Sequence, residues 1–340
     1  MRYPDFLPEN GTIGFVAPSF GAATEPYITR FESALQKFHA MGYKSIEAGH
    51  ARASEGIGIS GPPDVLGAEL NGMYLNSGAD ALISIGGGEL MCEVVPYIDF
   101  DAIAASKPKW YMGYSDNTNF TFLSATLADT AAIYGYCAPS FGMGEWHESL
   151  SDALRLLCGR QKSVRGYPAW ERDDGGEEDP LAGFNLTEKT EYRYFNADGA
   201  AKMSGRLLGG CLDILNCIRG TRFDRVREFN ARYREDGVIW FLECCDLSVL
   251  DMRRTLWATR EAGWFDSAKG FLIGRPFHYD EPLMGLDQYD AVTGVLGPLG
   301  VPIVMDVDIG HLPPMLPIVC GAMADVDAGG NNIEIRYDFR

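Results

Sequence analysis

The chain has 340 residues, of which 46% are hydrophobic and 22% charged. This is the composition of a folded globular protein, and the length suggests roughly two domains, which excludes both a disordered chain and a miniature disulfide scaffold. Lysine and arginine together number 29 against 47 aspartates and glutamates, giving a formal net charge of −18. A charge of this sign disfavours binding to a phosphate backbone, so we expect no nucleic-acid partner.

The sequence also bears on cellular context and cofactors. The first residues contain no basic start, apolar run or small-residue cleavage site, so we expect no secretory signal. The longest apolar stretches, such as residues 238–242, are far shorter than the ~18 residues that span a bilayer. We therefore expect a cytoplasmic protein with no membrane partner. The eight cysteines show no C-x-x-C pair, which predicts reduced, mostly buried thiols and no metal site.

Strand and helix signals alternate through the first 160 residues. Strands are expected at 12–16, 44–47, 79–85, 109–113 and 132–136, and helices at 27–38, 63–75, 90–97, 117–127 and 149–158. This alternation predicts right-handed crossovers and a doubly wound, mostly parallel sheet in an α/β fold. We expect residues 1–160 to form an N-terminal domain.

The pattern fails over residues 161–202, which we interpret as an interdomain loop. Its acidic run is most simply a solvated, mobile segment; it comprises Glu171, Asp173, Asp174, Glu177, Glu178 and Asp179. Strand and helix patterns alternate again over residues 203–340, which we expect to form a smaller C-terminal α/β domain. Strands are expected at 205–208, 238–242, 271–274 and 303–306, and helices from 212, at 250–262 and at 289–296. The segments 318–326 and 333–337 predict a β-hairpin tail.

Ser115 is the candidate nucleophile. It lies in Gly113-Tyr114-Ser115-Asp116, between an apolar strand and a helix, where a hydroxyl would point above the carboxyl ends of parallel strands. The backbone N–H of Asp116 is then a candidate oxyanion donor, and the turn at Gly86-Gly87 is a candidate for the second. The alternative is that Ser115 and Asp116 only cap the helix, because both residue types are preferred N-caps.

A base and a carboxylate would complete such a site. Of five histidines, His278 and His311 follow strands of the second half, and His311 has the better context because Gly310 precedes it and prolines follow it. Glu243 closes an apolar strand, where an unpaired charge would be costly. Asp246 is the competing carboxylate, although its position favours a helix N-cap.

Taken together, these motifs resemble the LD-carboxypeptidase family of serine peptidases, within it the branch related to microcin C self-immunity peptidases. The resemblance rests on Gly11-Thr12-Ile13-Gly14-Phe15-Val16-Ala17-Pro18-Ser19, Ser84-Ile85-Gly86-Gly87, Pro96-Tyr97-Ile98-Asp99-Phe100-Asp101, Gly113-Tyr114-Ser115-Asp116, Leu207-Leu208-Gly209-Gly210-Cys211-Leu212, Phe241-Leu242-Glu243 and Asp308-Ile309-Gly310-His311. It implies Ser115 as nucleophile, His311 as base and Glu243 as orienting carboxylate, with oxyanion amides from Asp116 and Gly86-Gly87. It also implies a class I amidotransferase-like N-terminal domain, a homodimer and no cofactor.

The substrate is left open between two classes. The microcin-like alternative predicts cleavage of peptidyl or aminoacyl nucleotides, including aminoacyl sulfamoyl adenylates, with Trp170 as the candidate nucleobase-binding aromatic or else a hydrophobic anchor. The murein alternative predicts release of terminal D-alanine from muropeptide tetrapeptides, which requires a cation such as Arg206 or Arg275 for the carboxylate. A non-catalytic ligand-binding protein is a third hypothesis. Cys211 and the pair Cys244-Cys245 depart from the residues usual in the family.

Overall fold

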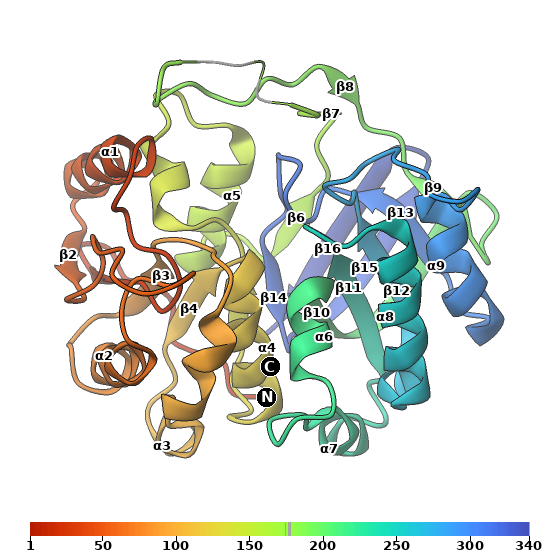
Figure 1. Ribbon diagram of the computed structural model, residues 1–340, viewed down its shortest axis with the longest axis horizontal. Helices are drawn as coiled ribbons and strands as arrows, with labels where there is room; N and C mark the ends of the chain where they lie inside the picture. The colour runs from red at the N-terminus through yellow and green to blue at the C-terminus, as the bar shows by residue number, and fades with distance from the viewer. Residues whose placement is uncertain (174, 176–177, 340) are drawn as a thin grey trace.

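The computed structural model describes residues 1–173, 175 and 178–339 (Figure 1). Within that part of the chain, one sheet has six strands in the order β14-β5-β4-β3-β1-β2. Its parallel members are β1 (Thr12–Val16), β2 (Lys44–Glu47), β3 (Ala81–Ser84), β4 (Trp110–Gly113) and β5 (Ala132–Tyr134). The expected strand–helix alternation of the first half is confirmed.

Helices connect these strands, and their apolar faces cover the sheet. They are α1 (Tyr27–Ala40), α2 (Pro63–Leu75), α3 (Phe100–Ala105), α4 (Thr118–Thr126) and α5 (Glu148–Leu157). In α1, Phe31, Leu35 and Phe38 are buried at the spacing that puts one helix face against the core. The α4 helix is buried along its whole length, because it lies between this sheet and the second half of the chain.

The helix expected at residues 90–97 is wrong. This segment forms two short 3₁₀ turns, Met91–Glu93 and Val95–Tyr97. Pro96 has no backbone N–H and cannot sit inside an α-helix without clashing with the preceding turn. The helix α3, which the sequence did not reveal, begins just afterwards, where the side chain of Asp99 accepts a hydrogen bond from the Ala102 N–H.

The second sheet has eight strands among the described residues, in the order β6-β16-β15-β10-β11-β12-β13-β9. Its parallel centre is β10 (Ala200–Cys211), β11 (Val238–Glu243), β12 (Ala268–Gly274) and β13 (Ile303–Val307). The expected hairpin is formed by β15 (Met323–Gly329) and β16 (Asn332–Asp338). Its first strand begins at Met323 rather than at residue 318 as expected, and residues 318–320 belong to the first sheet instead. The associated helices are α6 (Leu212–Ile218), α7 (Val226–Arg232), α8 (Val249–Glu261) and α9 (Gln288–Leu296).

One strand of the second half belongs to the first sheet, and the connecting segment also contains strands. The strand β14 (Ile318–Cys320) pairs with β5 of the first sheet, although it lies near the end of the chain. Within residues 161–202, β6 (Ser163–Arg165) and β9 (Arg193–Phe195) pair with the second sheet, while β7 (Ala169–Trp170) and β8 (Glu188–Lys189) pair with each other. This segment passes over the top of both halves in Figure 1. Asp174 and Glu177 of its acidic run lie outside the described residues.

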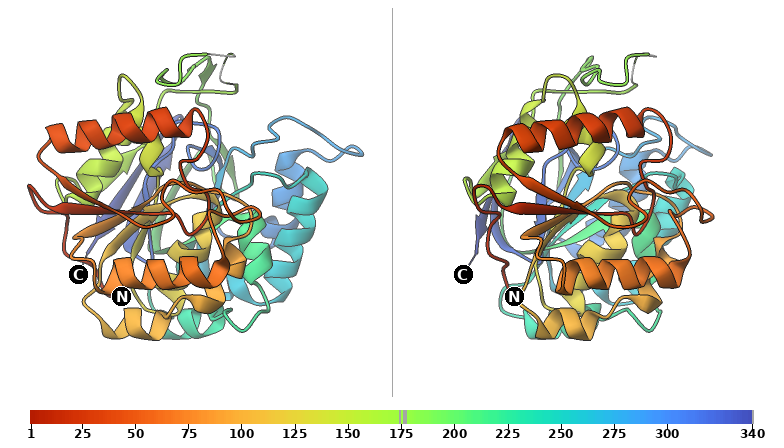
Figure 2. Two further views of the ribbon diagram at one scale, coloured as in Figure 1. Left: turned by 60° about the vertical axis from the view of Figure 1, so that its left-hand side comes forward. Right: turned by 90° about the vertical axis from the view of Figure 1, so that its left-hand side faces the viewer.

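The two ends of the chain lie close together, as all three views of the ribbon show (Figure 2). Tyr3 and Phe339 pack edge to face there, with ring centroids 5.4 Å apart. No helix in the described structure is both long and apolar enough to cross a membrane.

The halves approach each other closely where β10 ends. At Gly210, an added Cβ would lie 2.6 Å from Thr118 Cγ2 of α4, so a side chain there would push the halves apart. Next to it, the Cys211 N–H donates to Thr118 Oγ1 at 3.0 Å. Gly210 therefore allows the nucleophile-bearing half to be hydrogen-bonded directly to the second sheet.

Candidate active site

Ser115 lies at the carboxyl end of β4, on a tight turn that leads into α4. Residues Ser115–Asn117 form one 3₁₀ turn, and Ser115 has φ +62°, a left-handed conformation that non-glycine residues rarely adopt. The Ser115 N–H donates to the Tyr134 hydroxyl at 3.1 Å, which helps to hold this conformation. A strained strand-to-helix turn of this kind raises a serine hydroxyl above the sheet.

The capping hypothesis for Ser115 and Asp116 is wrong. In the described structure, neither the 3₁₀ turn nor α4 has a side-chain cap hydrogen bond, and the residues before them are Tyr114 and Asn117. The buried carboxylate of Asp116 instead accepts hydrogen bonds from Ser19 Oγ and the Met91 N–H. Its side chain therefore ties the turn to two neighbouring loops.

His311 is the histidine that reaches Ser115. Its Nε2 lies 2.8 Å from Ser115 Oγ, although 196 residues separate them in the chain. Each of the other four histidines has a partner elsewhere: His39 contacts Ser45, His50 contacts Glu69, His147 contacts Ser149 and His278 contacts Glu281. His311 and not His278 is therefore the histidine in contact with Ser115, and its role as base stays a prediction.

Glu243, the last residue of β11, lies behind His311. Its Oε2 is 2.9 Å from His311 Nδ1, and the residue is only 1% exposed. Gly310 makes this contact possible, because an added Cβ there would lie 2.6 Å from Glu243 Oε2. Asp246, the competing carboxylate, is exposed, and the N-cap of α8 is Ser248 rather than Asp246.

The pKa values of His311 and Glu243 are both shifted from their ordinary values. Burial by itself would lower the pKa of His311, but the charge of Glu243 and the hydrogen bonds with Cys245 and Glu243 outweigh it, and the pKa of His311 is raised well above 6.5. Burial would raise the pKa of Glu243, but His311 and the hydrogen bond from Tyr134 outweigh it, so that pKa is lowered. The geometry thus favours an ionised glutamate that holds the imidazole with Nδ1–H toward it.

Tyr134 is a site residue that the sequence analysis missed. Its hydroxyl donates to Glu243 Oε1 at 2.5 Å and accepts the Ser115 N–H, so one buried phenol joins the serine turn to the carboxylate. It comes from the end of β5, and Glu243 from the second sheet. Only its position at the carboxyl end of a parallel strand could have indicated it, which is where ligands bind in open α/β sheets.

The two glycines expected at the oxyanion position lie beside the serine. An added Cβ at Gly87 would be 3.0 Å from Ser115 Cβ and 3.2 Å from its Oγ, so a side chain there would crowd the hydroxyl. Gly86 lies on the same turn, and its carbonyl accepts a hydrogen bond from Asn117 Nδ2 at 2.7 Å. The oxyanion roles of Gly86, Gly87 and Asp116 stay predictions.

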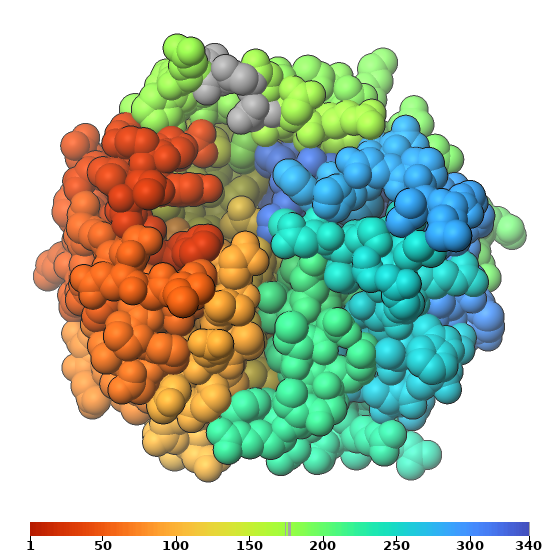
Figure 3. Space-filling view, viewed as in Figure 1, coloured from red at the N-terminus to blue at the C-terminus, as the bar shows by residue number. Residues whose placement is uncertain are grey.

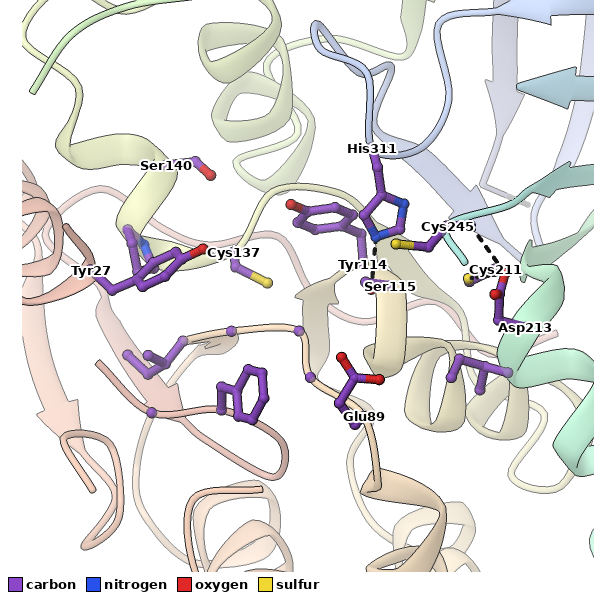
Figure 4. A pocket seen from close by; sticks show the side chains of 18 of the residues that line it. Tyr27, Glu89, Tyr114, Ser115, Cys137, Ser140, Cys211, Asp213, Cys245 and His311 are labelled. Carbon is purple, nitrogen blue, oxygen red and sulfur yellow. Dashed lines mark hydrogen bonds between the residues drawn. The ribbon is translucent and has the colours of Figure 1, made fainter. Parts of the chain in front are cut away.

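Ser115 and His311 open into a cavity of about 560 Å³ between the two halves of the chain. The surface is hollowed there between the red-orange and green-blue parts of Figure 3. Figure 4 shows His311 directed at Ser115. The lining residues are Phe20, Gly21, Ala23, Thr24, Tyr27, Ser54, Ile85, Gly86, Gly87, Gly88, Glu89, Tyr114, Ser115, Cys137, Pro139, Ser140, Cys211, Asp213, Ile214, Cys217, Cys245, Asp246 and His311. Among these described residues, none is lysine or arginine.

The two arginines considered as carboxylate ligands lie elsewhere. Arg206 donates to Asp236 Oδ2 at 2.6 Å, and its guanidinium lies 3.8 Å from the centre of the Tyr233 ring. Arg275 is buried and paired with Asp308. Neither lines the cavity that holds Ser115.

Trp170 also lies outside the lining of the Ser115 cavity. It is 5% exposed, its ring centre lies 4.8 Å from the Arg275 guanidinium, and its Nε1–H donates to the Lys189 carbonyl at 3.2 Å. These contacts hold the connecting segment against the second sheet. They fit the hydrophobic-anchor alternative for Trp170 better than the nucleobase-binding one.

All eight cysteines are free thiols. Cys137, Cys211, Cys244 and Cys320 are buried, while Cys217 is exposed. Four of them, Cys137, Cys211, Cys217 and Cys245, line the cavity. The departures from the family pattern at Cys211 and Cys245 therefore fall within the cavity itself.

A serine on a tight strand-to-helix turn of an α/β fold, hydrogen-bonded to a histidine that contacts a carboxylate, is the arrangement of serine hydrolases. Residues 13–135 match the LD-carboxypeptidase N-terminal domain and residues 204–326 the LD-carboxypeptidase C-terminal domain. The chain therefore belongs to the LD-carboxypeptidase family of serine peptidase-type hydrolases.

Relatives and solved structures share the whole architecture. The chain is 27% identical to the microcin C7 self-immunity protein MccF of Escherichia coli, over 96% of this chain and 94% of that protein. The structure of MccF in complex with aspartyl sulfamoyl adenosine is 24% identical, with a TM-score of 0.82 over 100% of this chain and 99% of that one. The complex of MccF with glutamyl sulfamoyl guanosine is also 24% identical, with a TM-score of 0.81 over 99% and 98%. The MccF-like two-domain fold is thus confirmed.

Proposed function

We propose that this protein hydrolyses the amide-type bond of aminoacyl or peptidyl nucleotides through an acyl-enzyme, with Ser115 as nucleophile, His311 as base and Glu243 as the orienting carboxylate. The observation that carries the proposal is the hydrogen-bonded chain from Ser115 Oγ through the imidazole of His311 to Glu243, at the edge of a cavity large enough for such a substrate.

The reaction has two stages, formation of the acyl-enzyme and its hydrolysis. His311 Nε2 accepts the Ser115 proton as Oγ attacks the carbonyl carbon, and the tetrahedral oxyanion forms beside Gly87. The C–N bond then breaks, and the leaving nitrogen takes the proton from His311. Water next attacks the ester carbonyl and gives its proton to His311. The ester bond breaks, Ser115 Oγ recovers the proton, and the acid is released.

Two observations favour the nucleotide substrate over a muropeptide. MccF, which has the same fold, is described in complex with aspartyl sulfamoyl adenosine and with glutamyl sulfamoyl guanosine. Release of a terminal D-alanine would bring a free carboxylate into the site, where a fixed arginine or lysine would normally bind it. None of the described residues that line the cavity is of either type.

The test is to incubate the purified protein separately with asparaginyl sulfamoyl adenosine and with a muropeptide tetrapeptide, and to follow products by mass spectrometry. We expect asparagine and sulfamoyl adenosine from the first. Release of D-alanine from the second, with the first left intact, would replace this proposal with the murein alternative. Turnover of neither, together with saturable binding, would support a non-catalytic ligand-binding protein.

The pH dependence of turnover is a further expected result. Only neutral His311 can accept the Ser115 proton, and Glu243 raises the pKa of His311 well above 6.5. The value of kcat/KM should therefore rise with pH through this raised pKa, so that the acidic limb of the profile lies on the alkaline side of an ordinary histidine. Initial rates measured from about pH 5 to about pH 10 would show this limb, because the range includes the ordinary titration of histidine and extends above it. A midpoint at or below 6.5 would contradict the expected shift.

Tyr134→Phe should lower kcat/KM by about 10- to 100-fold, with little change in KM, because Tyr134 positions both Ser115 and Glu243 without lining the cavity. Without the hydrogen bond from the Tyr134 hydroxyl, the Glu243 carboxylate would stabilise protonated His311 more strongly. The pKa of His311 should then rise further, and the acidic limb of the kcat/KM profile should move to higher pH. The matched control is Tyr74→Phe, which removes a buried hydroxyl that donates to the Lys109 carbonyl, far from Ser115. Identical profiles for Tyr134→Phe and the unmodified protein would exclude this role.

A further inference from the structure

The charge of the Ser115 cavity indicates which acyl group it accepts, an inference that rests on the proposed function. Three described lining residues carry carboxylates, Glu89, Asp213 and Asp246, and none carries an ammonium or guanidinium group. This cavity holds the nucleophile, so any group attached to the scissile carbonyl must lie within the electrostatic field of these carboxylates. Charges around a partly enclosed cleft act more strongly than on an open surface.

The remaining titratable groups of the cavity do not offset these carboxylates. The thiols of Cys137, Cys211, Cys217 and Cys245 have pKa values raised chiefly by burial, so they remain neutral. Protonated His311 has its charge balanced by Glu243 directly behind it. Glu89, Asp213 and Asp246 therefore determine the sign of the cavity.

The carboxylates come from both halves of the molecule. Glu89 follows the Gly86-Gly87-Gly88 turn and lines the cavity, and Figure 4 shows its carboxylate below Ser115. On the other side, the Asp213 carboxylate is fixed by the N–H groups of Cys245 at 3.1 Å and Asp246 at 2.9 Å. Asp246 is exposed on the same loop. A substrate bound beside Ser115 would thus lie between acidic groups.

We propose that the cavity selects acyl groups with a cationic side chain, so that the substrate class is a basic aminoacyl nucleotide, of the lysyl type, rather than an acidic one. A side-chain ammonium would be attracted by Glu89 and Asp246, whereas a side-chain carboxylate would be repelled without a cation to pair with. The arginines that could have reversed this sign, Arg206 and Arg275, are paired with Asp236 and Asp308 away from the cavity.

The experiment compares two pairs of sulfamoyl adenosines, each matched in size and differing in charge. Lysyl sulfamoyl adenosine is compared with the norleucyl compound, and aspartyl sulfamoyl adenosine with the asparaginyl compound. We expect kcat/KM to be about tenfold higher for lysyl than for norleucyl, and about tenfold lower for aspartyl than for asparaginyl. Both ratios should shrink as the salt concentration rises, because the interactions are electrostatic and the cavity is open to solvent.

A double variant, Glu89→Gln with Asp246→Asn, tests which groups are responsible. Both side chains are exposed, so the substitutions should not disturb the core, and Asp213 is left intact because it accepts two backbone N–H groups. We expect both ratios to fall to within about threefold of unity. Glu235→Gln, an exposed acid that does not line the cavity, is the matched control and should leave both ratios unchanged.

The outcomes separate this inference from the proposed function. Hydrolysis of all four compounds without a charge preference, or a preference for aspartyl over asparaginyl, overturns the inference and leaves the proposed function standing. Hydrolysis of none of them overturns both. A lysyl preference that persists in the double variant shows that the charge selection comes from other residues and overturns the assignment to Glu89 and Asp246.

Discussion

Ser115→Ala is expected to reduce turnover of a confirmed substrate by about 10⁴-fold or more, because without Oγ no acyl-enzyme can form. The residual rate would come from binding and from the amides near the oxyanion. The variant should fold normally, since the Ser115 N–H that donates to the Tyr134 hydroxyl belongs to the backbone and is retained. Alanine also fits the left-handed φ of +62° no worse than serine does.

Two measurements would check this result. Single-turnover kinetics should show loss of the acyl-enzyme phase, and a fluorophosphonate probe should label the unmodified protein but not the variant. Ser204→Ala, which removes an exposed hydroxyl on β10, should retain both activity and labelling of Ser115. Activity of Ser115→Ala within tenfold of the unmodified protein would remove Ser115 from the mechanism.

Glu243→Gln is expected to lower kcat/KM by about 10³- to 10⁴-fold. The amide has nearly the size of the carboxylate, so the packing against Gly310 is kept. It lacks the negative charge that stabilises the imidazolium formed when His311 takes the Ser115 proton. A glutamine can also present its NH₂ group to the imidazole, which favours the tautomer with its proton on Nε2, and such a histidine cannot accept the serine proton.

The pH profile distinguishes this electrostatic role from a merely structural one. Since the charge and hydrogen bond of Glu243 raise the pKa of His311, their loss should move the acidic limb of kcat/KM to lower pH, in addition to lowering the rate. Glu334→Gln is a suitable control, because Glu334 also has a lowered pKa but pairs with Arg165 of β6 and Arg336 of β16. If Glu243→Gln lowered the rate with no displacement of the limb, the proposed stabilisation of the imidazolium would be wrong.

Local sequence patterns predicted the elements well where the apolar spacing and the turn residues agreed. The strands β1 to β5 and the helices α1, α2, α5, α8 and α9 lie where expected, because buried runs and one-sided apolar spacing are local properties of the chain. The failures have local causes too. Pro96 breaks the expected helix at 90–97, and the short helices α3 and α7 hold too few residues for a clear period.

The sequence indicated candidate residues for the site but not their geometry. Ser115 at the end of a strand and His311 after a glycine are visible in the sequence, and the resemblance to the family links them to Glu243. The role of Tyr134 and the placement of Trp170 and Arg275 away from Ser115 are not visible there. Each depends on how the two sheets pack against each other.

The sequence by itself determined the α/β class and the turn that carries Ser115, because a strand, a tight turn and a helix are specified by residues adjacent in the chain. Only the tertiary structure decided that Ser115 meets a histidine 196 residues away, which in turn meets a carboxylate 68 residues distant. Contacts at such separations follow from strand order and from the crossing of β14 into the first sheet. The physical reason is that local interactions set each element, whereas burial of the faces between elements sets which ends come together.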